Sequence, residues 1–140
     1  MDVEVNGLAI VLAAVVAMVI GSAWYANAFF GKEWRKLLKL SKDKEKELAN
    51  KSIFKAVIAS LISAYILSHI IAFAVAFYPE RSAISVALST AFFVWIGFYF
   101  SHMFMQDSFE QRPGKITVIN TANMLVTLLA MGAVIALITY

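Results

Sequence analysis

The sequence predicts an all-α fold, a transmembrane bundle of four antiparallel helices. Four long apolar runs without an internal proline fill most of the 140 residues, at about 7–30, 53–78, 83–104 and 116–139. Each approaches or exceeds the ~20 apolar residues that cross a bilayer core. The mean hydropathy of +0.78 and the 61% hydrophobic share lie far above those of soluble domains. The runs are continuous, without the alternation of barrel strands, and residues 1–140 are therefore expected to form one helical membrane domain.

The basic residues predict the orientation of these spans. The segment joining the first two spans carries nine Lys and Arg residues if Lys55, at the start of the second span, is included, and the joint between the last two carries two, so these regions hold 11 of the 12. Positively charged loops tend to stay in the cytoplasm, so we expect a cell-membrane protein with both termini outside. The first loop is expected to contact anionic lipid headgroups. Nucleic acid is not a predicted partner, because no aromatic residues interleave with the Lys run.

The first loop is the only joint with room for structure of its own. Residues 31–40 place Trp34, Leu37 and Leu38 on one helical face, and the other face carries the basic residues Lys32, Arg35, Lys36 and Lys39. This pattern predicts a short amphipathic helix in the headgroup plane. The alternative is a solvated, partly frayed charged loop. The mixed-charge stretch 42–47 is typical of a solvated helical face.

The other two joints are short and predict antiparallel neighbours. Pro79 stops the second span, and Ser82 is placed to cap the third. Pro113 and Gly114 precede the fourth span in the same way.

Small residues recur at every fourth position in two of the spans. The first span has Ala9, Ala13, Ala17 and Gly21, and the second has Ala56, Ser60, Ala64, Ser68, Ala72 and Ala76. Such spacing lets helix backbones approach closely in lipid. It predicts that these two spans form the tightest pair or a subunit interface. Alanine is common in membrane helices, so chance is the alternative explanation.

Polar residues within the spans are the candidate functional groups, because burying them in a bilayer is costly. His69 lies near the middle of the second span, at about the depth of Thr127 in the fourth. A proton relay is one interpretation of His69. The other is a structural imidazole bonded to a hydroxyl or a carbonyl. No metal site is predicted, because no second His or carboxylate lies at that depth.

A second polar group gathers toward the predicted cytoplasmic side of the spans. Its members are Trp24, Tyr25, Tyr99, His102, Asn120 and Asn123. Asn120, Asn123 and Thr127 share one helical face. These residues predict either a polar pocket open to the cytoplasm or an interfacial belt with amide hydrogen bonds between helices. The nearby loop holds Asp107, Glu110 and Arg112, which are interpreted as a helix end with an exposed ion pair, at the mouth of the pocket if the pocket exists.

Five short segments together resemble a family of small four-span prokaryotic membrane proteins, catalogued as domain of unknown function 1761. They are Gly21-Ser22-Ala23-Trp24-Tyr25, Phe30-Gly31-Lys32-Glu33-Trp34, Ala64-Tyr65-Ile66-Leu67-Ser68-His69, Phe109-Glu110-Gln111-Arg112-Pro113 and Ile119-Asn120. The resemblance covers nearly the whole chain. It implies the four-helix architecture and assigns no activity. It draws attention to Trp24, Tyr25, Gly31, Trp34, His69, Glu110, Arg112 and Asn120, whereas Ala26-Asn27 departs from the family pattern, which has a proline there.

Catalytic motifs are missing from the sequence. It contains no cysteine, no paired carboxylate inside a span and no nucleophile or nucleotide-binding signature, so no catalytic residue and no cofactor is predicted. The favoured function is a non-catalytic subunit that assembles with itself or with another membrane protein. The alternatives are a small-solute or ion transporter or channel formed by an oligomer and, less favoured, an enzyme acting on lipid or quinone.

Overall fold

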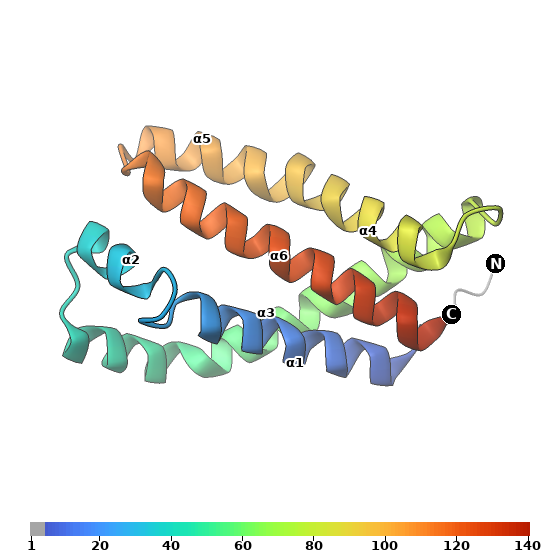
Figure 1. Cartoon of the computed structure of the whole chain (residues 1–140), viewed down its shortest axis with the longest axis horizontal. Coiled ribbons are helices and arrows are strands. Elements are labelled where there is room, and N and C mark those ends of the chain that lie inside the picture. Colours follow the sequence, from blue (N-terminus) through green and yellow to red (C-terminus); the bar gives the residue numbers. More distant parts are fainter. Residues whose placement is uncertain (1–4) are drawn as a thin grey trace.

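The computed structural model describes residues 5–140, which form helices and the connections between them (Figure 1). Four helical stretches are long and apolar enough to cross a membrane: Gly7–Trp24, Lys42–Phe77, Ala83–Phe109 and Gly114–Thr139. These stretches correspond to the four predicted runs, although several of their ends differ.

Helix α1 (Gly7–Trp24) ends six residues before the predicted boundary at residue 30. The Asn6 side chain caps its start by accepting hydrogen bonds from two backbone N–H groups of the first turn. After Trp24 the chain turns. The Phe30 N–H donates to the Trp24 carbonyl oxygen at 3.0 Å, and the Gly31 N–H donates to that of Ala26 at 3.1 Å. The apolar composition of residues 28–30 led to the longer prediction, but their backbone forms a compact turn.

Helix α2 (Gly31–Leu38) fills the first joint, and helix α3 (Lys42–Phe77) follows it. The Ser41 side chain caps α3 by accepting a hydrogen bond from the Lys44 N–H. The predicted second span, 53–78, is only the apolar part of this 36-residue helix. The mixed-charge stretch 42–47 is helical, as predicted. At 1.5 Å per residue α3 is about 54 Å long, against a hydrocarbon core of about 30 Å.

The third predicted span is one helical stretch with a π-helical interruption. It consists of α4 (Ala83–Val94), the π-helix η1 (Trp95–Phe100) and α5 (Ser101–Phe109), and so ends five residues after the predicted residue 104. Ser82 stands at the predicted N-cap position, but its side chain makes no capping hydrogen bond. The Trp95 Nε1–H donates to the Thr121 carbonyl oxygen at 2.8 Å, which joins the π-helix to the last helix.

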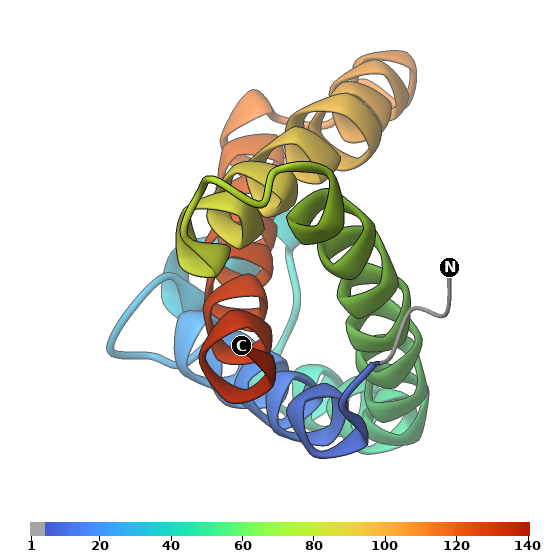
Figure 2. The ribbon, with the colours of Figure 1, turned by 90° about the vertical axis from the view of Figure 1, so that its right-hand side faces the viewer.

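Helix α6 (Gly114–Thr139) lies between α1 and α4 (Figure 2), and α3 completes the bundle by packing against α1 and α4. A close crossing of α4 and α6 occurs at Gly132, where an added Cβ would lie 3.2 Å from the Ala87 carbonyl oxygen. Ile71, Met131 and Ile135 are fully buried in the apolar core.

The small-residue stripes lie partly at helix contacts. Their buried members are Ala9, Ala13, Ala17, Ala64, Ser68 and Ala72, whereas Ala56 and Ala76 are exposed. Helix α1 packs more extensively against α6 than against α3. The prediction that the first two spans form the tightest pair is therefore wrong within the chain. The face of α1 that carries small residues also packs against α6.

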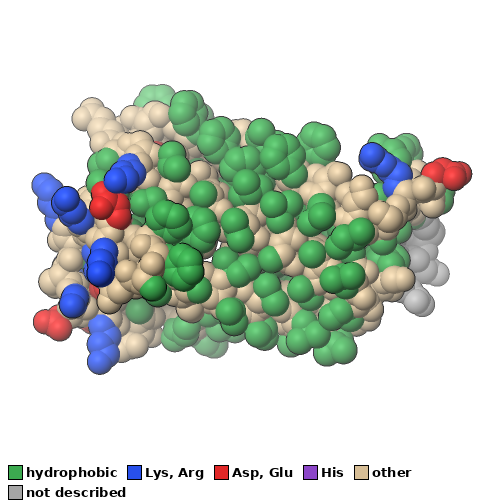
Figure 3. Space-filling model, in the orientation of Figure 1, with side chains coloured by type: hydrophobic (Ala, Val, Ile, Leu, Met, Phe, Trp, Pro, Cys, Tyr) green, Lys and Arg blue, Asp and Glu red, His purple; other side chains and the backbone are tan. Residues whose placement is uncertain are grey.

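Charged side chains gather at the two ends of the molecule (Figure 3). We call the end that holds α2, the start of α3 and the joint between α5 and α6 the basic end. The opposite end holds the turn with Glu80 and Arg81 (Figure 3). Between them the surface is apolar, with side chains such as Phe93 and Phe98 more than two-thirds exposed.

Candidate functional site

Several of the predicted polar residues meet where the turn after α1 reaches the basic end of α6. The Trp24 Nε1–H donates to the Ile119 carbonyl oxygen at 3.1 Å. The Tyr25 hydroxyl donates to Asn120 Oδ1 at 2.8 Å. The rings of Tyr25 and Trp34 lie 5.2 Å apart. We call this group, Trp24, Tyr25, Trp34 and Asn120, the aromatic junction. The Trp24 indole and the Tyr25 phenol donate within the chain, as in the predicted pattern of hydrogen bonds between helices.

Gly31 brings α2 close to the aromatic junction. A Cβ built on this glycine would lie 2.1 Å from the Tyr25 carbonyl oxygen and 2.8 Å from that of Ala26. Only a residue without a Cβ allows this approach of backbone to backbone. Five of the eight residues that the family resemblance singles out, namely Gly31 and the four of the aromatic junction, therefore belong to one structural unit.

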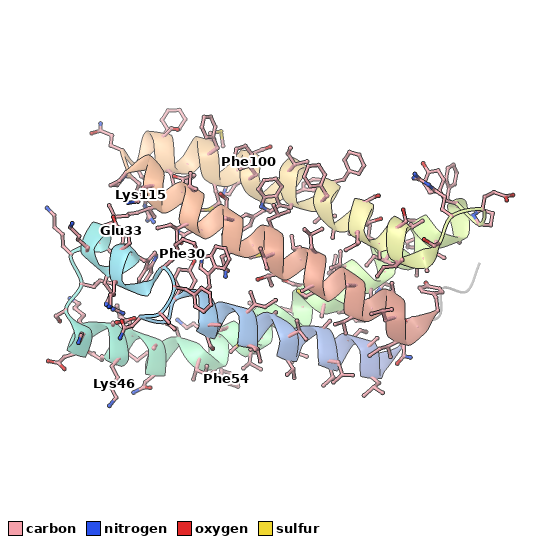
Figure 4. The ribbon with its side chains drawn as sticks, in the orientation of Figure 1. Phe30, Glu33, Lys46, Phe54, Phe100 and Lys115 are labelled. Atoms are coloured by element: carbon pink, nitrogen blue, oxygen red, sulfur yellow. The ribbon has the colours of Figure 1, made fainter. Side chains whose placement is uncertain are left out.

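Two ion pairs hold α2 against its neighbours. Arg35 pairs with Glu45 of α3 at 2.9 Å, and its side chain, which was predicted on the basic face of this helix, is mostly buried. Lys115 of α6 pairs with Glu33 at 2.8 Å, and Figure 4 shows the two side chains reaching toward one another. The hydrogen bond from Lys115 and its charge hold the pKa of Glu33 below its ordinary value. These contacts fix α2 to the bundle.

A pocket of about 340 Å³ lies between α1, α3 and α6, and it is open to the surroundings along α3, where Ile53 and Ala56 are exposed. We call it the inner cavity. It is walled by small residues, among them Ala17, Gly21 and Ala56, and it is also lined by Asn123 and Thr127. Asn123 Nδ2 and Thr127 Oγ1 are buried without a hydrogen-bond partner among the described residues. The predicted face of α6 is thus divided, since Asn120 is engaged in the junction while Asn123 and Thr127 line the pocket, each with a buried polar atom that has no partner among the described residues.

The remaining predicted residues lie apart from this cavity. His69 Nδ1 hydrogen bonds at 2.8 Å with the Tyr65 carbonyl oxygen, one turn earlier in the same helix. This contact fits the structural interpretation of the imidazole. Tyr99 is half-buried and lines a groove between α3 and η1. His102 is exposed on α5, and no hydrogen bond joins it to the aromatic junction.

The sequence interpretation placed Asp107 at a helix end with an exposed ion pair. Asp107 does lie in the last turn of α5, but the predicted exposure is wrong, since the residue is only 2% exposed. Asp107 Oδ2 accepts a hydrogen bond from the Thr117 hydroxyl at 2.7 Å, and Oδ1 has no hydrogen-bond partner among the described residues. The sequence signal for this burial was the position of Asp107, just before the end of the helix and ahead of the joint that contains Pro113.

The loop residues Glu110 and Arg112 form the predicted ion pair, with 2.6 Å between Glu110 Oε2 and Arg112 Nε. The same Nε lies 3.8 Å from Asp107 Oδ1. A hydrogen bond from Gln106 and, to a smaller extent, the charge of Arg112 keep the pKa of Glu110 below its ordinary value. One guanidinium therefore faces two carboxylates, of which Asp107 is the more distant and the more buried.

No cluster of three or more potential metal ligands occurs among residues 5–140. The apolar surface, the four long helices and the polar groups kept at helix contacts define a multi-span helical membrane protein. Within that class the chain belongs to DUF1761, a family of proteins of unknown function, whose family model matches residues 8–136. No curated protein matches the chain. No solved structure matches it.

Proposed function

We propose that this protein is a non-catalytic membrane subunit that assembles with itself or with another membrane protein. In this proposal the four long helices cross the cell membrane in alternating directions, with the basic end in the cytoplasm and both termini outside. Helix α2 lies in the headgroup layer and contacts anionic lipids. The distribution of Lys and Arg supports the orientation. The close backbone approach at Gly31 and the two ion pairs of α2 support its placement beside the bundle.

The observation that carries the proposal is a groove on the lipid-facing side between α3 and η1. Helix α3 packs against α4 but has little contact with η1 and α5, and the resulting groove has a volume of about 340 Å³. Its walls are mainly apolar, and they include Ser63 and Tyr99. A hydroxyl within a bilayer is stabilised by a hydrogen bond across a helix interface, and small residues such as serine favour close helix approach. These features suit a neighbouring transmembrane helix.

The first test measures the mass of the protein in native nanodiscs by native mass spectrometry. We expect a defined homo-oligomer or a complex with a second membrane protein. Ser63→Trp should fill the groove and dissociate that assembly. Val11→Trp, at a half-exposed position of α1 that does not line the groove, is the matched control and should leave it intact. A wild-type monomer without a protein partner would reject the proposal.

The orientation has a separate test, because the chain contains no cysteine. Single-cysteine variants at the exposed positions Lys46 and Glu80 can be labelled with a membrane-impermeant maleimide in intact cells. We expect labelling at residue 80 only. Labelling at residue 46 in intact cells would reverse the proposed orientation.

A small-solute transporter or channel formed by an oligomer is the second candidate. The inner cavity favours it, because unpartnered polar groups at Asn123 and Thr127 are costly in a bilayer unless they meet water or a solute. The core beyond it is filled by Ile71, Met131 and Ile135, which argues against a path through one chain. Solute flux into proteoliposomes that is lost in Asn123→Leu and kept in Val11→Leu would favour this candidate.

A further inference from the structure

Asp107 lies in the wall of a second cavity at the basic end, on the surface between α5 and α6. This cavity, which we call the headgroup cavity, has a volume of about 410 Å³. Its lining includes Phe100, Phe104, Asp107, Arg112, Thr117 and Thr121. It is distinct from the inner cavity, which lies between α1, α3 and α6. Phe104 and Val118 are both more than 60% exposed to the surroundings, so the headgroup cavity opens to the lipid side of the bundle.

The carboxylate of Asp107 has a hydrogen-bond donor for only one of its two oxygens. Thr117 donates to one oxygen, whereas the other, Oδ1, is buried without a hydrogen bond from the described residues. A buried carboxylate is costly unless it is paired and hydrogen bonded. Arg112 Nε is 3.8 Å from Oδ1 but 2.6 Å from Glu110 Oε2, so this guanidinium is bound mainly to Glu110. One positive charge among two negative ones leaves the region with an excess of one negative charge.

The lining of the headgroup cavity combines this carboxylate with aromatic rings. Phe100 and Phe104 stack with 5.9 Å between their ring centroids, and Figure 4 shows Phe100 on the helix that leads to α5. Aromatic faces attract cations, and a carboxylate accepts hydrogen bonds from an ammonium group, which has three donors. The combination favours a ligand with a primary ammonium group.

The position of the headgroup cavity further restricts the class of ligand that fits it. It lies where two apolar helical stretches, Ala83–Phe109 and Gly114–Thr139, meet at the basic end, and Figure 3 shows charged side chains gathered at that end. A ligand there needs an apolar body to lie along Phe104 and Val118. The guanidinium of Arg112, which is 43% exposed, can meet a phosphate next to the ammonium. A ligand with an ammonium group, a phosphate and apolar chains would satisfy all of these contacts.

We infer that the headgroup cavity binds an ethanolamine phospholipid, with its ammonium on Asp107 and its phosphate on Arg112. Because Oδ1 is buried, the ammonium reaches it when the exposed Arg112 side chain, already bonded to Glu110, moves away from Asp107. This inference does not depend on the oligomeric state or on the transport activity considered above.

Native mass spectrometry of the detergent-solubilised protein tests the inference. Phosphatidylethanolamine, phosphatidylcholine and phosphatidylglycerol of equal chain length are added at equal concentration. The loss of one charged hydrogen bond typically weakens binding by about tenfold. We therefore expect about tenfold weaker phosphatidylethanolamine binding to Asp107→Asn. Glu47→Gln removes an exposed carboxylate at the same end and should bind as the wild type does. Equal binding of the three lipids to the wild-type protein would overturn the inference, as would equal binding to both variants.

A second measurement covers the case in which Asp107→Asn fails to fold. The thermal unfolding of the wild-type protein is followed with each lipid and with free phosphoethanolamine. We expect phosphatidylethanolamine to raise the unfolding temperature more than the other two lipids do. Equal protection by free phosphoethanolamine would identify a soluble amine as the ligand and would refute the lipid assignment. Equal protection by phosphatidylcholine would refute recognition of the primary ammonium.

Discussion

Replacing Gly31 by alanine should destabilise the protein at the aromatic junction. The new Cβ would lie 2.1 Å from the Tyr25 carbonyl oxygen, which is 1.3 Å short of the 3.4 Å at which ordinary contact begins. A second carbonyl oxygen, that of Ala26, would lie at 2.8 Å. Both obstacles are backbone atoms, so neither can move aside by a side-chain rotation. Overpacking of this kind typically costs about 1–3 kcal/mol, and we expect a loss of that size in the free energy of unfolding.

The assay is reversible unfolding in mixed micelles, followed by tryptophan fluorescence. Gly21→Ala is the matched control, because a Cβ there meets nothing within 4 Å. Replacing a helical glycine by alanine adds about 0.5–1 kcal/mol of helix stability, so the control should be neutral or stabilising. Lys32, next to Gly31 and exposed, can be changed to cysteine to report whether α2 leaves the bundle. Equal stability of Gly31→Ala and Gly21→Ala would refute the close approach of α2 to the turn.

Three further predictions concern helix contacts. Gly132→Leu should lower the free energy of unfolding by about 1–3 kcal/mol, because it separates α4 from α6; unchanged stability in the same assay would contradict this. Ser68→Leu should destabilise the protein more than Ile66→Ala, because Ser68 is buried and Ile66 is half-exposed; equal tolerance would argue against the α3 contact face. The pKa of Glu33 is lower in the folded protein than its unfolded value of 4.5. Its pairing with Lys115 therefore stabilises α2 at pH values above 4.5, and this stabilisation is lost as the pH falls from 4.5 through the lowered pKa. The protection of the α2 amides, taken relative to the intrinsic exchange rate at each pH, should fall as Glu33 is protonated, and Lys115→Gln should remove that dependence.

The sequence was sufficient to predict the four helices because each is marked by a long apolar run, and Pro79 and Pro113 mark the turns. It was less informative about their ends. The residues after Trp24 are as apolar as those before, so only the hydrogen bonds of the turn reveal where α1 stops. The charged start of α3 differs from its span in composition but has equally good helix formers, so the helix continues.

The candidate site was harder to predict, because its features depend on contacts between distant parts of the chain. Asn120 and Asn123 are three residues apart on one face of α6, yet one bonds Tyr25 and the other lines the inner cavity. The burial of Asp107 depends on Thr117, ten residues later, packing against it across the joint. The π-helix has no periodic signature in the apolar run that contains it, so it could not be predicted from the sequence.

Helix α3 joins the charged residues that follow Lys42 to the apolar part of the same helix without a break in its helical backbone. In a bilayer, a change in the tilt of this helix therefore also shifts its charged start. A thicker bilayer is matched by a smaller tilt and a thinner one by a larger tilt. Because Arg35 ties α2 to Glu45 near the start of this helix, a change in tilt also swings α2. We therefore expect a change in bilayer thickness to move α2 together with the charged start of α3.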